Sequence, residues 1–132
     1  EENTKTWLNI CRNPAIDVIG HCGSEENKFY YERVIPEFKA CGKIVEINAS
    51  SVISRPSSVK NCRQIALLCK KYEVPIVVSS DAHICYEVGE FTAALTMLAG
   101  IDFPEKLVLN AGGVTKIAAH IKKKRGVDIT EG

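Results

Sequence analysis

Three short motifs in the sequence carry polar side chains that could bind a metal ion or act on a substrate. They are Gly20-His21-Cys22-Gly23, Glu46-Ile47-Asn48 followed by Ser50 and Ser51, and Ser80-Asp81-Ala82-His83. In extended chain, residues two apart project to the same side, so Asp81 and His83 can point together into one site. Imidazole and carboxylate groups form a ligand set that suits zinc, manganese or iron.

Each of these motifs also has an ordinary structural interpretation. A single histidine after a strand more often makes a structural hydrogen bond than binds a metal ion. A Ser-Asp pair before a helix is frequently only an N-cap. The sequence nevertheless favours a functional site, because all three motifs lie where a predicted strand ends and a loop begins. In α/β barrels, the catalytic residues lie at these positions.

The elements that would position these motifs alternate between strand and helix. Strand-like runs, short and apolar, occupy residues 15–19, 43–47 and 75–78, with a fourth and shorter candidate at 107–109. Apolar residues at helical spacing cover residues 4–12, 31–38, 59–69, 91–98 and 114–121. The order predicts an α/β fold with a parallel sheet, either half of a (β/α) barrel or a small open sheet. A helix ahead of the first strand suggests that the chain is part of something larger.

Proline and serine residues indicate where two of the predicted helices begin or bend. Pro36 lies within the pattern of residues 31–38, so we expect it to start or kink that helix. Ser57 or Ser58 is the expected N-cap of the helix that covers residues 59–69.

Composition limits the classes of protein. The chain has 132 residues, 45% of them hydrophobic and 25% charged, which predicts one globular unit over residues 1–132. A net charge of +1 gives no broad field for nucleic acid or an anionic membrane. No apolar run is long enough to span a bilayer. The basic run of residues 122–125 is interpreted as complementing the dipole at a helix C-terminus, although a nucleic-acid contact is the alternative.

The six cysteines form no CxxC pair, so reduced thiols and a cytoplasmic location are predicted. Cys62 and Cys69 sit on a helical pattern and are expected in the core. Cys22 and Cys85 could supply soft metal ligands, but small residues lining the site are the preferred interpretation. His120, on a predicted helix, is interpreted as a surface or packing residue.

Taken together, the motifs resemble the closing motifs of PHP (polymerase and histidinol phosphatase) phosphoesterases. The resemblance runs from about residue 14 to residue 125 and includes Arg55, Gly89-Glu90-Phe91, Phe103-Pro104 and residues 107–110. It implies the C-terminal half of a distorted (β/α)7 barrel, with the N-terminal half of the barrel as its partner. Cys22 departs from the family, which commonly has proline after the histidine.

The resemblance also implies a cluster of divalent metal ions at the strand ends, with zinc expected and manganese or iron as alternatives. It makes His21, Asp81 and His83 metal ligands and assigns catalysis to Asp81 and His83. The family's remaining ligands would lie outside this sequence. Arg55 is a candidate phosphate clamp because a guanidinium pairs with two phosphate oxygens, although a solvated loop arginine is about equally expected. Asn48 and Ser50 are further candidates for substrate binding.

The expected activity is metal-dependent hydrolysis of a small phosphomonoester. One alternative is a PHP module attached to a DNA polymerase, and another is a non-catalytic half-barrel. A half-barrel would have two open sheet edges and would leave barrel-facing side chains, such as Ile44 and Val77, without opposite neighbours. Self-association is therefore a further expectation.

Overall fold

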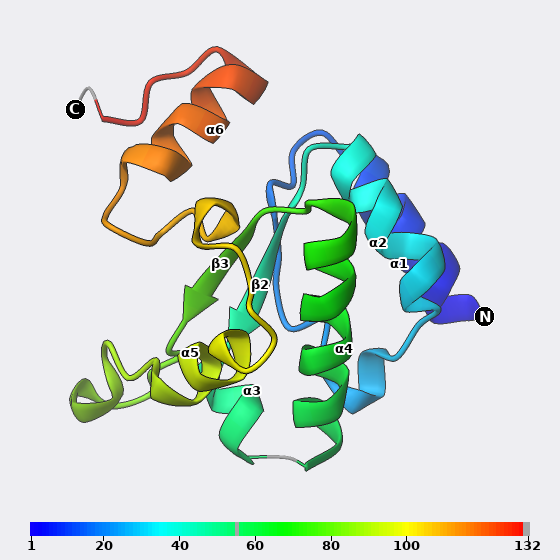
Figure 1. The fold of residues 1–132 in the computed structure, drawn as a ribbon. Coiled ribbons are helices and arrows are strands. Elements are labelled where there is room, and N and C mark those ends of the chain that lie inside the picture. Colours follow the sequence, from blue (N-terminus) through cyan, green and yellow to red (C-terminus); the bar gives the residue numbers. More distant parts are fainter. Residues whose placement is uncertain (55, 131–132) are drawn as a thin grey trace.

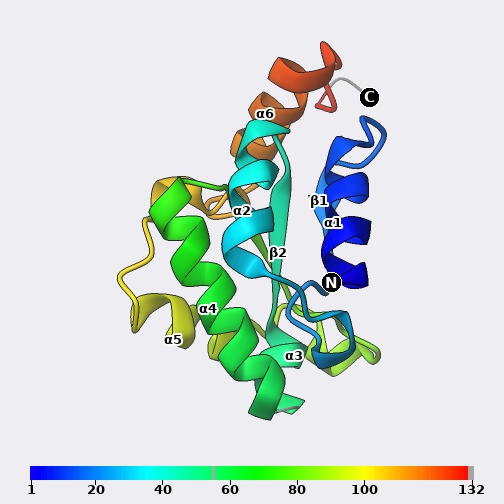
Figure 2. The same ribbon diagram turned by 90° about the vertical axis from the view of Figure 1, so that its right-hand side faces the viewer.

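The computed structural model describes residues 1–54 and 56–130 and has an α/β architecture. In this part of the chain, one sheet contains three parallel strands in the order β1-β2-β3, of which Figure 1 labels β2 and β3 and Figure 2 labels β1. The strands are β1 (Val18–Ile19), β2 (Ile44–Asn48) and β3 (Ile76–Ser79). The register pairs Ile19 with Val45 and Glu46 with Val77. All three strands therefore end at the same edge of the sheet.

Helices connect the strands in sequence order. Over the described residues they are α1 (Glu2–Arg12), α2 (Tyr31–Ala40), α3 (Ala49–Ser54), α4 (Pro56–Tyr72), α5 (Thr92–Ala99) and α6 (Thr115–Arg125). Short 3-10 turns lie at η1 (Glu25–Asn27), η2 (Cys85–Glu87) and η3 (Glu105–Leu107). None of the described helices is both long enough and apolar enough to cross a bilayer.

The core lies between one face of the sheet and helices α2 and α4. Side chains alternate along β2, so Val45 and Ile47 point into this core and are buried. Helix α2 adds Phe38, which is also fully buried. Figures 1 and 2 show α4 running alongside β2, with α2 packed next to it. The opposite sheet face carries Glu46.

The second and third predicted strands are confirmed, but the first and fourth are shorter than expected. Only Val18–Ile19 of the first run pairs as a strand. The fourth run forms an isolated bridge between Val108 and Ile76 instead of a strand. Beyond the bridge, the Asn110 side chain takes the place of a neighbouring strand. It accepts a hydrogen bond from Val78 N–H at 3.0 Å and donates one to Val78 O at 2.7 Å.

The expectation of two fully open sheet edges is therefore wrong at β3. The backbone of β3 is bonded by Leu109, whose N–H donates to Ile76 O at 2.8 Å, and by Asn110. The expectation that Ile44 lacks neighbours is also wrong, because Ile44 is fully buried. Val77, on the same face, is partly exposed as expected.

The structure settles two expectations about where helices begin. Pro36 is the sixth residue of α2, so it does not start that helix, and the alternative, that it kinks the helix, stays a prediction. Helix α4 begins at Pro56, which places Ser57 and Ser58 in its first turn instead of at the N-cap. Proline suits a first helical position because its fixed φ is helical and the N–H that it lacks would be unpaired there.

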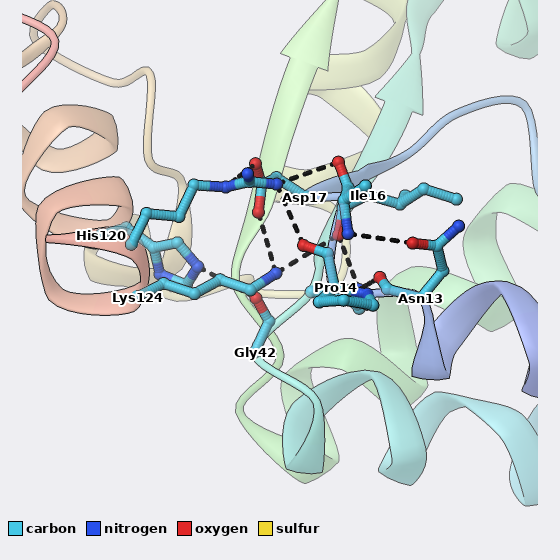
Figure 3. Close-up of polar contacts among 10 residues, drawn as sticks. Asn13, Pro14, Ile16, Asp17, Gly42, His120 and Lys124 are labelled. Carbon is cyan, nitrogen blue, oxygen red and sulfur yellow. Dashed lines mark hydrogen bonds and ion pairs between the residues drawn. The ribbon is translucent and has the colours of Figure 1, made fainter. Parts of the chain in front are cut away.

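Helix α6 is fixed to the segment that precedes β1 (Figure 3). The Asp17 carboxylate accepts from Lys124 Nζ at 2.8 Å and pairs with Arg125 Nε at 2.7 Å. Arg125 also donates to the carbonyl oxygens of Pro14 and Ala15. His120 Nε2 lies 3.2 Å from Gly42 O, which agrees with a packing role. The basic run thus supplies the contacts that hold α6, in addition to complementing its dipole.

Asp17→Asn is expected to destabilise the fold by about 1 kcal/mol at neutral pH. Burial raises the pKa of the Asp17 carboxyl. The hydrogen bonds and charges of Lys124 and Arg125 outweigh that effect, so the pKa lies below its ordinary value of 3.8. A carboxyl with a lowered folded-state pKa stabilises the protein above its unfolded pKa, and this stabilisation is lost as the pH falls through the folded pKa.

Urea unfolding at pH 7 and at several values below pH 4 measures this contribution. The difference between wild type and Asp17→Asn should shrink as the pH falls below about 4. Asp102→Asn, at an exposed carboxylate, is the matched control and should change stability little. An equal effect of the two substitutions at pH 7 would contradict the role given to Asp17.

Candidate functional site

A polar cavity of about 330 Å³ opens at the carboxyl ends of the strands. Its lining combines the candidate metal ligands with serine side chains: His21, Ser24, Ser50, Ser51, Ser58, Asp81 and His83. Three separate segments, which follow β1, β2 and β3, contribute to it. The parallel sheet brings these segments together because its strands all end at one edge.

His21 and Asp81 share an unusual backbone conformation. Both have φ +52°, in the left-handed region that residues other than glycine rarely adopt. Glu73 and Asp102 also have positive φ, but Glu73 directly follows helix α4, where a left-handed residue commonly ends a helix, and Asp102 lies in the turn after α5. No helix ends at His21 or Asp81. Conformations of this kind cluster at functional sites, so they support a functional assignment.

The side chains of His21 and Asp81 approach each other across the cavity. His21 Nε2 lies 3.9 Å from Asp81 Oδ2, and both side chains are partly accessible, with 51% and 30% exposed. His83 lines the same cavity and is exposed. Its backbone N–H donates to Glu87 Oε2 at 3.0 Å, which anchors the loop after β3.

The candidate substrate-binding residues Ser50 and Asn48 differ in whether they line the cavity. Ser50 lines the cavity. Asn48 is buried and is not among the lining residues. Its Oδ1 accepts from Ser51 N–H at 2.9 Å, and its Nδ2 lies 3.5 Å from His21 Nδ1. Asn48 therefore contacts the histidine ring instead of the cavity. Arg55 lies outside the described residues.

Sequence reasoning missed the role of Glu46 and the two serines Ser24 and Ser58. Glu46 accepts from His21 N–H at 2.9 Å and from Ser79 Oγ at 2.6 Å. Strand alternation contained the signal, because it puts Glu46 on the same sheet face as Asn48. Ser24 and Ser58 come from loops and helix starts, and no local pattern distinguishes them.

The cysteines near the site are buried thiols. Cys22 follows His21 but is buried, and burial raises the pKa of its thiol well above the ordinary value. Burial, with the charge of Glu46, raises the pKa of Cys62 to about 11. Neither Cys22 nor Cys62 is among the residues that line the cavity. Cys62 and Cys69 are buried as expected, Cys85 is exposed, and all six cysteines are free.

Asp81 does not cap the following helix. Helix α5 begins at Thr92, and its N-cap residue is Phe91, which makes no side-chain capping bond. The structural alternative for Asp81, an N-cap of a helix over residues 87–99, is therefore wrong. The turn η2 occupies Cys85–Glu87 instead.

The histidine and aspartate side chains at the cavity are of types that bind metal ions, but among the described residues too few of them are grouped to hold one. Imidazole and carboxylate are ligands for zinc, manganese or iron. Within residues 1–54 and 56–130, however, no three His, Cys, Asp or Glu side chains are placed to hold an ion together. An ion bound at this cavity would need ligands beyond those that the described residues supply.

The fold and cavity define an α/β chain whose candidate site lies at the carboxyl ends of parallel strands. A family model described as PHP-associated matches residues 60–108. A probable phosphatase of Caldanaerobacter subterraneus is 44% identical over 126 residues, which cover 95% of this chain and 49% of that protein. A probable phosphatase of Clostridium botulinum is 39% identical over 124 residues, covering 94% of this chain and 51% of that protein.

These matches confirm the resemblance to the PHP family. The relatives align with nearly the whole chain, and the family model falls on α4, β3 and the segment that follows them. The chain spans about half the length of the curated relatives it matches.

Proposed function

We propose that this chain contributes part of the active site of a metal-dependent PHP phosphatase that acts on a small phosphomonoester. The observation that carries the proposal is the pairing of His21 with Asp81. Both residues hold left-handed backbone at strand ends, and their side chains meet at one cavity. The names of the relatives, which are probable phosphatases, support the same reaction class.

We further propose that the three strands form part of a distorted (β/α)7 barrel, with residues 1–132 as one unit. Parallel strands in sequential order with helical crossovers support this architecture. The sheet face opposite the core carries Glu46, Val77 and Ser79, none of which is fully buried. In the proposed barrel this face would look inward.

In this proposal His21, Asp81 and His83 hold one side of a metal cluster, with zinc expected. A bound divalent ion would supply hydroxide near neutral pH and offset charge on the phosphoryl oxygens. Asp81 and His83 are proposed to accept the proton of the attacking water. The hydroxyls of Ser24 and Ser51, which line the cavity, are proposed to donate to phosphoryl oxygens or to substrate hydroxyls.

A chelator experiment on the full-length protein that contains this chain tests the proposal. The protein is stripped of metal, then assayed with p-nitrophenyl phosphate after zinc or manganese is added back. Turnover should be lost on stripping and restored by a divalent ion. The corresponding bis-p-nitrophenyl diester is the comparison substrate and should react more slowly. Turnover that is unchanged after the metal is removed would contradict metal dependence. The absence of turnover under every condition would favour a non-catalytic module.

A further inference from the structure

Glu46 is a carboxylate in the middle strand of the sheet, where an apolar residue would ordinarily lie. Its strand neighbours Val45 and Ile47 are buried in the core, so alternation turns Glu46 to the opposite face. Placing a carboxylate on this partly buried face carries a desolvation cost unless hydrogen bonds offset it. Ile44, on the same face, shows that this face also accepts an apolar residue.

Both oxygens of Glu46 are engaged, and they join the ends of the two outer strands. Oε2 accepts from the backbone N–H of His21, two residues after β1. Oε1 accepts from the hydroxyl of Ser79, the last residue of β3. The oxygen–oxygen distance of 2.6 Å in the second contact is typical of a hydroxyl bonded to a carboxylate. One side chain thus links the segments that carry His21 and Asp81.

The hydrogen bond from His21 N–H to Glu46 involves a residue with a strained backbone conformation. His21 is held at φ +52°, and such a conformation persists only where the surroundings stabilise it. The preceding residue is Gly20, where a Cβ would stand 3.4 Å from Glu46 Oε2. Asn48 adds a second contact at the ring, with Nδ2 3.5 Å from Nδ1.

We propose that Glu46 is a positioning residue that holds His21 toward Asp81 in the reactive geometry. The inference rests on the proposed function and deepens it, because it assigns a role to a residue that does not line the cavity. Glu46 acts through two contacts, one to the His21 amide and one to the Ser79 hydroxyl. A purely structural carboxylate would affect stability but leave the histidine's geometry and turnover unchanged.

Glu46→Gln in the full-length protein is the first test. Glutamine keeps the shape and one acceptor oxygen, but it removes the negative charge that strengthens both hydrogen bonds. We expect kcat to fall about tenfold, with KM within about twofold and the melting temperature within a few degrees. Ser79→Ala removes the other partner but keeps the bond to His21, so its kcat should fall less than threefold. Glu32→Gln, at an exposed carboxylate on α2, is the matched control and should leave kcat unchanged.

A spectroscopic measurement separates positioning from general stability. With ¹⁵N-histidine labelling, the His21 amide is assigned by its loss in a His21→Asn variant. Its resonance should move in Glu46→Gln and stay in place in Glu32→Gln. If the wild-type protein shows metal-dependent turnover and Glu46→Gln has the same kcat, this inference alone is overturned, whether or not the His21 amide resonance moves. Wild-type protein without metal-dependent turnover would overturn the proposed function instead.

Discussion

Asp81→Ala is expected to lower turnover of the full-length protein by several orders of magnitude while the fold survives. Asp81 lies beyond β3, 30% exposed and 3.9 Å from His21, so its loss removes charge from the site without opening a cavity in the core. In the proposed function this carboxylate is both a metal ligand and a proton acceptor. Its removal would therefore weaken metal binding and chemistry together. Turnover, metal content and melting temperature are the three measurements.

The backbone at Asp81 calls for a second variant. Alanine tolerates φ +52° less well than aspartate does, so Asp81→Ala carries a conformational cost of about 1 kcal/mol that is unrelated to chemistry. Asp81→Asn keeps the shape and tolerates this backbone, and it removes only the charge. We expect Asp81→Asn to lose nearly as much turnover as Asp81→Ala, with a smaller loss of stability.

Ser80→Ala is the neighbouring control and should be much milder, because Ser80 does not line the cavity that contains Asp81. If Asp81 served only to stabilise the loop, the pattern would be reversed, with stability lost and turnover kept. An Asp81→Asn protein with near-normal turnover and metal content would show that the site is placed wrongly.

The chain of residues 1–132 by itself is expected to have no appreciable phosphatase activity. The described residues offer His21, Asp81 and His83 at one cavity, yet no three donors converge on a single position. A zinc ion generally needs at least three protein ligands, and a cluster of ions needs more. In the proposed function the missing donors lie outside residues 1–132, and the chain spans about half the length of the relatives it matches.

The measurement is turnover and bound metal for this chain beside the full-length protein, with zinc or manganese added to each. We expect the shorter chain to retain less than one equivalent of tightly bound ion after gel filtration. Circular dichroism on the same samples checks that the chain is folded. Turnover by the folded chain that matches the full-length protein would refute the proposed division of the metal site.

Local sequence determined most of the elements around the site. The runs at residues 43–47 and 75–78 are continuous and β-branched, and they form β2 and β3. Helix α5 ends at Ala99, next to the end of the apolar spacing over residues 91–98. The motifs that contain His21, Asp81 and His83 were recognisable because a strand end followed by polar residues is a short-range pattern. All three residues line one cavity, and their roles as ligands stay predictions.

Only the tertiary structure decided how the site residues contact one another. The contacts of Glu46 join residues 25 and 33 positions away, so no local pattern predicts them. The fourth strand was overpredicted for the same reason. Whether residues 107–109 form a strand depends on the partners available to β3, and the Asn110 side chain occupies the backbone groups of Val78. The left-handed backbone at His21 likewise depends on a distant contact, the hydrogen bond from its N–H to Glu46, which forms only when the strands assemble.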